Sequence, residues 1–556
     1  MYKGILKNRR AARIGIAAVV CAAFTCAGTG AFAAPSLSRP GADIAGEKQR
    51  SEIGLEDQTP AYQQGADDAQ FTIENFIMEA PDLYLNKEEL TRILEDGMGE
   101  KKTMDQLRRT VNELTVYCRT HGYPAAAVYL PPQESPDGII VLRVIPGRYG
   151  DIEIENNSRL RTPVAQRIIA GLKEDDIITS AKLETALYSV SDATGARAIG
   201  VLSPGREFGT SKLTVRIEDS KKSNTVVYVE NYGSRTTGRY RYGLQETLYD
   251  PSGMGDRANL GTVISNGSLR NFYVNYETVV GHGGTTLGAG IARMDYQVGG
   301  SLARLGAEGN SLTLSIFGQA PIYHLTNRSL SARYGYNYRD LTDDITAFAL
   351  SGEKHTNSFY AGLVGMHREQ GLTVNYNTNL TFGILGYDSD YSSFLGALNR
   401  VNEGTYTKLE ADVTAVQQLG HTTDFLVKVS GQKASRNLDS SEEFYLGGPN
   451  GVRAYAQGEG AGDEGVLGTA EMRWHTHVRG LTLSTFYDVG TTWVNKTALS
   501  SDNRVTLRGW GVSAAYSNPG DWFARVDYAR RIGLDASVAP KNSGANRIWF
   551  IAGKIW

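Results

Sequence analysis

The chain has 556 residues, too many for one small domain, so two to four structural units are expected. Its mean hydropathy of −0.31 and formal charge of −3 look like those of a soluble protein, but a membrane β-barrel has a similar average because its strands alternate in polarity. The 63 Gly and 30 Tyr against 3 Cys favour a turn-rich β protein with aromatic girdles over a helical enzyme.

Residues 1–33 have the pattern of a secretory signal peptide. Five basic residues precede the apolar run Ile14–Phe24, and Ala31-Phe32-Ala33 offers small residues for cleavage. The run is too short to span a bilayer, which argues against a membrane anchor. Without this segment the chain has 52 Lys and Arg against 60 Asp and Glu, a formal charge of −8 that argues against nucleic acid as a partner. One cysteine then remains, so no disulfide scaffold is possible.

Residues 34–68 are rich in Pro, Gly, Gln and acidic residues and show no sustained period. This composition is typical of a disordered leader or linker. Asp43–Leu55 is the only part of it that could form a short helix. No later segment has the roughly 18 consecutive apolar residues of a membrane helix, so a membrane role would have to be carried by strands.

Residues 69–147 are predicted to form a first small α+β unit. The predicted elements are a strand at Phe71–Phe76, helices at Asn86–Leu94 and Met104–His121, and paired strands at Ala126–Leu130 and Gly138–Val144. Cys118 lies on the apolar face of the second helix. A lone thiol in that position is expected to be a small buried hydrophobic residue, not a catalytic or metal-binding one.

Residues 148–221 repeat this order of elements and predict a second unit of similar size. The predicted elements are a strand at Asp151–Glu155, helices at Pro163–Leu172 and Ala181–Ala193, and strands at Ala198–Leu202 and Lys212–Glu218. The proline near the start of the first helix is typical of a helix N-terminus. The strand edges and helix grooves of two such units could bind an extended polypeptide by strand addition.

From residue 222 to residue 556 the helical spacing stops and short alternating strands follow one another. An apolar face alternates with a polar one in Arg270–Glu277, Gly465–Trp474 and Trp522–Arg530. About eleven strands are expected before residue 447, with an uncertainty of one in Arg328–His367, and about five from residue 465 onward. The total of roughly 16 is even, as in bacterial single-chain barrels.

Alternation alone does not distinguish a membrane barrel from a soluble β-sandwich, because both have one apolar face per strand. The signal peptide, the unbroken run of about 335 residues and the long polar loops favour a barrel whose apolar face meets lipid. The last strand ends on an aromatic residue, Trp556, next to Lys554, whose ammonium would have to reach past the lipid to water.

A long glycine-rich loop, within residues 440–465, interrupts the strands. Loops of this composition are usually disordered tips. This one carries a compact basic and aromatic tetrad, Val452, Arg453, Ala454 and Tyr455. In the later segment Leu481–Gly490, the period of 2 puts Asp488 on the face opposite the apolar residues. If the apolar face meets lipid, Asp488 faces the lumen, where it meets either channel water or a cation such as Arg453.

These two stretches resemble the superfamily of outer-membrane proteins that join POTRA domains to a β-barrel. In that superfamily the loop after the eleventh strand reads Gly-Gly-Pro and then Val-Arg-Gly-Tyr/Phe, and an inner-wall strand reads Phe-x-Asp-x-Gly. The matching residues are Gly447, Gly448, Pro449, Val452, Arg453, Ala454, Tyr455, Phe486, Asp488 and Gly490, with Glu471 as a supporting residue. The resemblance implies that the loop folds into the barrel and that Arg453 pairs with Asp488. Ala454 departs from the usual glycine, and its methyl group makes a positive φ costly.

Two POTRA-like units followed by a barrel resemble the two-partner secretion transporters of the haemolysin secretion/activation (TpsB) family. The implied fold is a membrane all-β protein, a 16-stranded transmembrane β-barrel preceded by two small α+β POTRA domains. The implied function is to move one large β-helical exoprotein, a haemolysin or adhesin, from periplasm to cell surface without nucleotide hydrolysis. The POTRA domains would capture this client, and the loop carrying Arg453 would shape its conduit.

The same resemblance implies further partners. The barrel would contact outer-membrane lipid, and its terminal Trp556 would hand it to the barrel assembly machinery. Residues 34–68 could form a plug in the pore. Two other functions stay open: an outer-membrane insertase of the same superfamily, which usually has three to five POTRA units, and a passive porin or adhesin, which needs neither POTRA units nor the tetrad.

No catalytic, cofactor or metal site is expected. His475 and His477 lie on one predicted strand face but lack a nearby third ligand. Gly281–Gly284 lacks the following Lys-Ser/Thr and the strand-to-helix context of a phosphate-binding loop. No Ser, His and acidic residue occur in a recognisable nucleophile setting. No enzymatic activity is therefore expected, and transport is the function that the resemblance implies.

Overall fold

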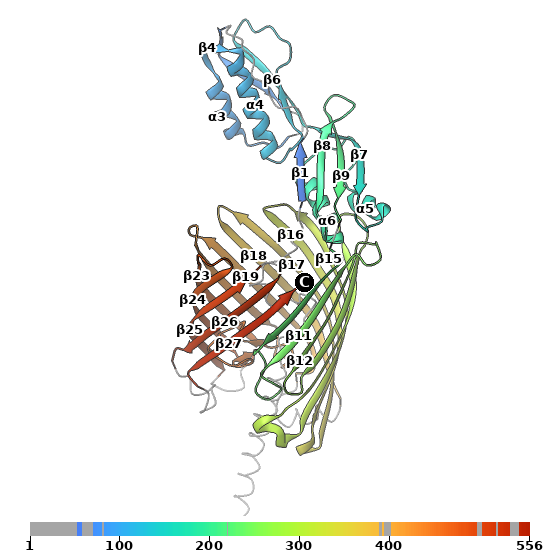
Figure 1. The fold of residues 1–556 in the computed structure, drawn as a ribbon, viewed down its shortest axis with the longest axis vertical. Helices are drawn as coiled ribbons and strands as arrows, with labels where there is room; N and C mark the ends of the chain where they lie inside the picture. The colour runs from blue at the N-terminus through green and yellow to red at the C-terminus, as the bar shows by residue number, and fades with distance from the viewer. Residues whose placement is uncertain are drawn as a thin grey trace, which may run out of the picture.

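Two small units lie at one end of a closed barrel in the computed structural model (Figure 1). The structure describes residues 53–57, 70–80, 83–219, 221–388, 392–393, 402–497, 503–518, 521–533 and 544–556. The predicted signal peptide at 1–33 and most of the predicted linker at 34–68 lie outside these residues. Within the described ranges, no helix combines the length and the apolar character needed to cross a membrane.

The first unit has a three-stranded sheet of order β3-β6-β5 and a separate pair, β2 with β4. Its elements are β2 (Gln70–Ile73), β3 (Asn75–Glu79), α3 (Lys87–Gly97), β4 (Gly99–Thr103), α4 (Met104–Thr120), β5 (Ala127–Tyr129) and β6 (Ile139–Ile145). The single strand predicted at Phe71–Phe76 is wrong, because the chain changes partner at Glu74: β2 pairs with β4, and β3 pairs with β6. Strand β4 was not predicted.

Helix α4 begins and packs as its sequence predicts. Thr103 caps it, since its side chain accepts from the backbone N–H of Gln106 and the Gln106 side chain accepts from the backbone N–H of Thr103. Leu107, Leu114 and Cys118 share one buried face and pack in the core that β5 and β6 complete. This burial raises the pKa of the Cys118 thiol to about 11.

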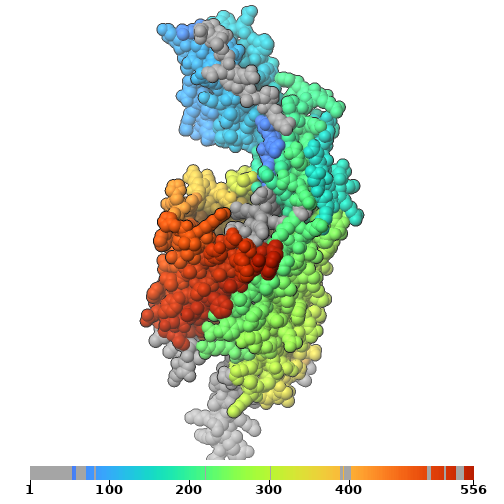
Figure 2. Space-filling model, in the orientation of Figure 1, coloured from blue at the N-terminus to red at the C-terminus, as the bar shows by residue number. Residues whose placement is uncertain are grey.

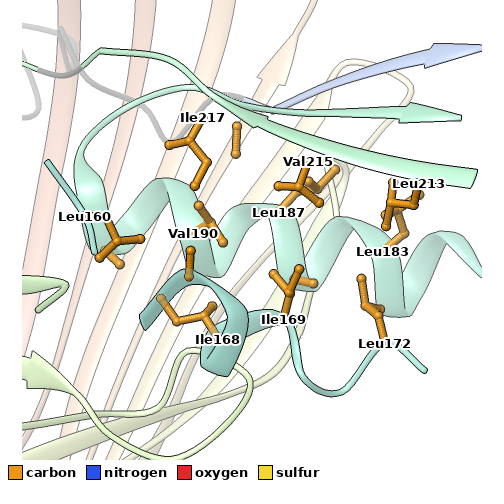
Figure 3. Close-up of a cluster of buried hydrophobic side chains, with 14 of the residues drawn as sticks. Leu160, Ile168, Ile169, Leu172, Leu183, Leu187, Val190, Leu213, Val215 and Ile217 are labelled. Atoms are coloured by element: carbon orange, nitrogen blue, oxygen red, sulfur yellow. The ribbon is translucent and has the colours of Figure 1, made fainter. Parts of the chain in front are cut away.

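The second unit consists of two helices packed on one face of a sheet. Its own elements are β7 (Arg148–Asn156), α5 (Thr162–Ile169), α6 (Ser180–Thr194), β8 (Ala198–Pro204) and β9 (Thr210–Ile217). Figure 3 shows Leu187 of α6 pointing toward Val215 of β9 and Leu183 pointing toward Leu213 of the same strand. Helix α5 adds Ile168 and Ile169 to the same buried core.

One part of the predicted linker is a strand. β1 (Ile53–Asp57) pairs in parallel with β8, so the sheet of the second unit has the order β1-β8-β9-β7. The prediction of an unstructured linker is wrong for these residues, and so is a helix that reaches Leu55. Ile53 packs against the core of the second unit, and Asp57 forms an ion pair with Arg119 of α4 at 2.7 Å. Strand β1 therefore contacts both units.

In the described part of the chain, sixteen antiparallel strands close into one barrel, as predicted. Those before the glycine-rich loop are β10 (Ser223–Glu230), β11 (Arg241–Tyr249), β12 (Asp256–Ser265), β13 (Arg270–Val279), β14 (Thr286–Gln297), β15 (Ala307–His324), β16 (Arg328–Ile345), β17 (Leu350–Glu369), β18 (Leu372–Tyr387), β19 (Gly404–Gln418) and β20 (Thr423–Ala434). Those after it are β23 (Glu464–His475), β24 (Leu481–Trp493), β25 (Arg504–Ser517), β26 (Trp522–Arg531) and β27 (Asn546–Ile555). The uncertain stretch Arg328–His367 holds two strands, and β10 pairs with β27 to close the barrel.

The faces of the strands alternate as predicted. In β26, Val526 is 50% exposed on the outside, whereas Asp527 is 1% exposed on the inside. Lys554 of β27 lies on the outer face, with its ammonium 5.0 Å from the centre of the Trp522 ring and 5.2 Å from that of Trp556. An apolar outer face and a polar inner one are what a barrel in lipid requires.

The second unit is fixed to the rim of the barrel, as Figure 2 shows. Ser189 of α6 donates to the carbonyl oxygen of Gly283, between β13 and β14, at 3.2 Å. The ring of Tyr188 stacks on that of His324, at the end of β15, with 3.9 Å between centroids. The backbone N–H of Trp556 donates to Thr225 at the same end. We call this the near end of the barrel and the opposite one the far end.

Candidate functional site

The loop between β20 and β23 enters the barrel from the far end. It covers residues 435–463 and contains a short hairpin of β21 (Phe444–Tyr445) and β22 (Ala461–Gly462). Val452 and Ala454 are fully buried, and Tyr455 is almost so. Val452 and Tyr455 pack in one cluster with Leu467 of β23 and Phe486 of β24. The tetrad therefore lies against the inner wall.

Arg453 is paired with Asp488 on that wall. Its Nε donates to Oδ2 and its Nη2 to Oδ1, each at 2.9 Å. The backbone N–H of Arg453 donates to the same carboxylate at 3.1 Å. Arg453 is 3% exposed and Asp488 is 0% exposed. Because two parallel hydrogen bonds set the angle as well as the distance, this pair holds the loop in one orientation.

Other wall residues surround the same guanidinium. Nη1 of Arg453 donates to Glu471 Oε2 at 3.0 Å and lies 3.5 Å from Asp527 Oδ1. The Cζ atom lies 3.2 Å from the centre of the Phe486 ring, a cation–π contact. Asp527 was not singled out from the sequence, although the alternation in β26 places it inward. The wall thus surrounds one loop cation with carboxylates and an aromatic face.

The wall also binds the main chain of the tetrad. The carbonyl oxygen of Arg453 accepts from Trp549 Nε1 of β27 at 2.6 Å. The carbonyl oxygen of Ala454 accepts from Arg531 Nε of β26 at 3.1 Å, and the Arg531 guanidinium lies 4.3 Å from the centre of the Tyr455 ring. Neither Trp549 nor Arg531 was identified from the sequence, since both belong to strands with no motif of their own.

Glycines allow the loop and the wall to approach closely. The backbone N–H of Gly447 donates to the carbonyl oxygen of Glu459 at 2.8 Å, and Gly448, which precedes Pro449, has a φ of +131°. A Cβ at Gly490 of β24 would lie 2.5 Å from a methyl carbon of Leu446. Gly490 therefore lies where a side chain would separate the loop from the wall, whereas side chains at Gly447 and Gly448 would meet residues 456–459 of the loop itself.

Ala454, which departs from the usual glycine of the motif, lies against a glycine of the wall. In the described part of the loop, positive φ values occur at Gly448, Gly458 and Gly460, so the backbone at Ala454 suits an L residue. The methyl group packs against Gly509 of β25, where an added Cβ would lie 2.7 Å from it. The absence of a side chain at Gly509 therefore leaves room for the methyl group of Ala454.

A second group of ion pairs holds the first part of the loop, and the sequence analysis did not identify it. Asp439 lies 3.1 Å from Lys354 Nζ of β17. Glu442 lies 3.0 Å from Lys408 Nζ of β19 and 3.2 Å from Arg339 Nη1 of β16. Lys354 and Lys408 are each 2% exposed. Two inward-facing lysines in lumenal strands were the signal that could have pointed to acidic partners.

The remaining candidates lie elsewhere. His475 ends β23 at the near end, where its Nε2 lies 2.6 Å from Asp424 Oδ2. His477 follows the end of that strand, so the prediction that the two histidines share a strand face is wrong. Among the described residues, no three His, Cys, Asp or Glu side chains are placed to hold a metal ion.

Comparison with known proteins identifies two families in the chain. Residues 209–516, more than half of it, match the model of the haemolysin secretion/activation protein ShlB/FhaC/HecB. Residues 71–147 match that of the ShlB-type POTRA domain. The heme/hemopexin transporter protein HuxB of Haemophilus influenzae is 28% identical over 466 residues, 82% of each chain. The outer membrane transporter CdiB of Dickeya dadantii is 19% identical over 407 residues, 70% of each chain.

Solved structures show the same fold. CdiB from Escherichia coli has a TM-score of 0.68 at 16% identity, over 90% of this chain and 93% of its own. BamA from Haemophilus ducreyi, lacking POTRA domains 1–3, has a TM-score of 0.52 at 14% identity, over 87% of this chain and 100% of its own. The first family model covers the barrel from β10 through β25 and includes the loop with its tetrad. The chain therefore belongs to the ShlB/FhaC/HecB family of haemolysin secretion/activation proteins, the outer-membrane transporters of two-partner secretion.

Proposed function

We propose that this transporter moves one large β-helical exoprotein, of the haemolysin or adhesin type, and that the loop carrying Arg453 shapes its path through the barrel. The family supplies the outer membrane as location and a secreted exoprotein as partner. The relative HuxB is named a heme/hemopexin transporter, which favours a haem-related cargo as a second candidate. The near end then faces the periplasm and the far end the cell surface.

Client capture is assigned to the two periplasmic units, both as POTRA domains. The first unit matches a POTRA model, and the second has the same order of elements apart from the β2–β4 pair. In the described residues, β3 and β5 form the edges of the first sheet. Unpaired backbone groups at such edges accept an extended polypeptide by strand addition. In the second unit β1 covers the edge of β8, so the edges of that sheet are β1 and β7.

The observation that carries the proposal is the burial of Arg453 against Asp488 inside the barrel. A loop held there narrows the conduit and must be placed in one way for the client to pass. The test is a double-mutant cycle of Arg453→Ala and Asp488→Ala, with the exoprotein in the medium as readout. Losses that do not add are expected, because each variant breaks the same pair.

The exposed Arg530→Ala serves as the matched control for charge loss in the same region of the barrel. It should secrete at the level of the parent. Strictly additive losses from Arg453→Ala and Asp488→Ala would contradict a shared role of the two residues. Growth on haem bound to hemopexin, compared between the parent and a deletion strain, distinguishes the haem-related cargo from a haemolysin or adhesin.

An outer-membrane insertase is the alternative, because the BamA barrel has the same fold. Deletion of the gene separates the two functions. Loss of one large secreted protein with normal levels of other barrel proteins supports transport. A broad loss of barrel proteins supports the insertase and contradicts client-specific secretion.

Biogenesis is assigned to the ends of the chain. Residues 1–33 direct export, and residues 34–52, which precede β1, provide a linker and a candidate plug for the pore. Trp556, half exposed at the near end, is the residue by which the barrel assembly machinery recognises the last strand. The outer face of the barrel contacts outer-membrane lipid. Removal of Trp556 should lower the amount of folded barrel in the membrane while leaving the precursor in the periplasm.

A further inference from the structure

The lumenal loop is held at two places that lie on opposite sides of its root. The root is formed by β20 and β23, which pair with each other. Arg453 contacts β23, β24 and β26 on one side, through Glu471, Asp488 and Asp527. Asp439 and Glu442 contact β16, β17 and β19 on the other side. The loop therefore bridges the lumen in both directions from its root.

The two contacts have opposite polarity. We call Arg453 and its three wall carboxylates the arginine anchor. We call Asp439 and Glu442, with Lys354, Lys408 and Arg339 of the wall, the acidic anchor. The loop contributes the cation to the first and the anions to the second. A change in the charge of the loop therefore acts in opposite directions at the two anchors, whereas salt screens the attraction at both.

The two anchors differ in what they leave behind when they open. Lys354 also lies 3.4 Å from Asp343 of β16, and Lys408 also lies 3.2 Å from Glu410 of its own strand. Each lysine thus keeps a carboxylate after the loop departs. Asp439 and Glu442 leave with the loop and regain water. Arg339 is left without the carboxylate of Glu442, but it gives up one hydrogen bond, at 3.2 Å. Opening of the arginine anchor would take three hydrogen bonds from Asp488.

Opening of the arginine anchor is more costly. Asp488 is fully buried, and in the described residues its ion pair within 4 Å is the one with Arg453. Thr469 donates to Asp488 at 3.0 Å but carries no charge. Removal of one partner from a buried pair is strongly destabilising, because it leaves an uncompensated charge. The arginine anchor is therefore the fixed point of the loop.

The apolar packing around the two anchors is also separate. Leu438, next to Asp439, packs with Leu385, Tyr387 and Tyr406. Val452, next to Arg453, belongs to a different cluster. No residue is shared between these two clusters as the described residues define them. Loss of one cluster does not remove the contacts of the other.

From this geometry we infer that the acidic anchor opens while the arginine anchor stays closed, and that this movement widens the conduit along β16–β19. The inference rests on the proposed function, since it assigns the moving part of the same loop. Opening uncovers Lys354, Lys408 and Arg339, so the widened side of the lumen is cationic. Asp439 and Glu442 are therefore positioning residues for the closed loop, and their removal changes both access and ion selectivity.

Thiol labelling of the full chain in lipid vesicles tests this order of opening. Leu438→Cys reports on the acidic anchor and Val452→Cys on the arginine anchor, with a membrane-impermeant maleimide as the probe. Native Cys118 is buried, and its raised pKa keeps it unreactive. With both anchors intact, both introduced thiols should be protected. In the Asp439→Asn/Glu442→Gln background, the thiol at position 438 should react about tenfold faster or more, and that at 452 should not change.

The control background is Glu308→Gln/Asp340→Asn, which removes two exposed acids from β15 and β16. It should leave both labelling rates unchanged. An unchanged rate at position 438 in the double-neutral background, rapid labelling there with both acids in place, or a joint rise at 438 and 452 would each overturn the inference. A joint rise means that the loop leaves as one body. Retained resistance of the barrel to unfolding by detergent without heat shows that each variant is folded.

Ion selectivity in a planar bilayer gives an independent readout. The Asp439→Asn/Glu442→Gln variant should shift the reversal potential in a salt gradient toward anions, because the uncovered wall is basic. A shift toward cations or none at all overturns the inference. Neither labelling nor conductance needs the exoprotein, so failure of these tests counts against the acidic anchor alone. Failure of the Arg453 and Asp488 secretion cycle counts against the proposed function.

Discussion

The second periplasmic unit and the lumenal loop both contain buried side chains, but different forces hold them in place. The second unit has one continuous apolar core that runs from Tyr149 to Ile217 and includes most of one face of α6. The loop has only small apolar clusters, and ion pairs fix its position. Apolar burial is non-directional and stabilises in proportion to area. Buried ion pairs add little net stability but penalise misplacement, so the unit is built for stability and the loop for position.

Replacement of Arg453 should have the largest effect, because it removes the cation that fixes the position of the loop. Arg453→Ala leaves Asp488 buried without its cation. This should lower the free energy that holds the loop against the inner wall by about 3–5 kcal/mol. The loop should then leave the wall, and Val452→Cys in this background should react rapidly with the impermeant maleimide. Arg453→Lys should restore only part of the protection, since an ammonium cannot form the two parallel hydrogen bonds. Protection equal to that of the parent in Arg453→Ala would contradict the anchoring role.

Truncation of a core side chain in the second unit should lower the stability of that unit and leave the position of the loop unchanged. Leu187 is 0% exposed, so Leu187→Ala should lower the free energy of unfolding of the periplasmic part by about 2–5 kcal/mol. Thermal unfolding followed by circular dichroism measures this loss. The labelling rate at position 452 should stay at the parental value. Leu55→Ala is the control, because Leu55 is 44% exposed on the same sheet and should change stability little. A change in the labelling rate at position 452 in Leu187→Ala would show that the stability of the unit and the position of the loop are coupled.

The regions also differ in how far the sequence predicts them. The barrel strands and the pairing of Arg453 with Asp488 could be predicted, because alternation assigns each residue to a face and the motif brings two distant stretches together. The helices of both units were predicted because caps such as Thr103 and the apolar spacing of α4 are local signals. Their ends differ from the predictions by a few residues only.

What was missed depends on partners that are distant in the chain. Ile53 of β1 pairs with Ala198, and no local pattern in a glycine-containing, acidic stretch indicates that strand. Asp439 and Glu442 have no motif, and their partners Lys354 and Lys408 look like ordinary lumenal polar residues until the strands are placed in order. The split of the first predicted strand into β2 and β3 likewise reflects a change of pairing partner.

The close contact of Ala454 with Gly509 offers a smaller perturbation at the loop. Gly509→Ala places a Cβ 2.7 Å from the methyl group of Ala454, and neither backbone can move freely. Such overpacking should weaken the binding of the loop to the inner wall by about 1–3 kcal/mol and raise the labelling rate at position 452. The double variant Gly509→Ala/Ala454→Gly should restore protection, because it moves the carbon from the loop to the wall. Persistent exposure in the double variant would show that the contact is not the cause.

The smallest effect is expected at Cys118, which lies in the apolar core of the first periplasmic unit. Burial raises the pKa of its thiol to about 11, from an ordinary value of 9.0. The thiolate is the reactive form, so at pH 8 the folded protein should react with a thiol probe about a hundredfold more slowly than the denatured chain. Because the folded pKa is the higher one, the protonated thiol favours folding. This contribution is complete below pH 9 and is lost as the pH rises toward about 11.

Cys118→Ala separates this titration from packing. The variant should lose a little stability at neutral pH, because the methyl group fills less of the core. Its stability should then depend less on pH between 9 and 11 than that of the parent, as followed by thermal unfolding at each pH. Equal reaction rates for the folded and denatured chains at pH 8 would show that the thiol is accessible. That result would mean that the apolar core of the first unit is not tightly packed, and the contrast with the ion-paired loop would fail.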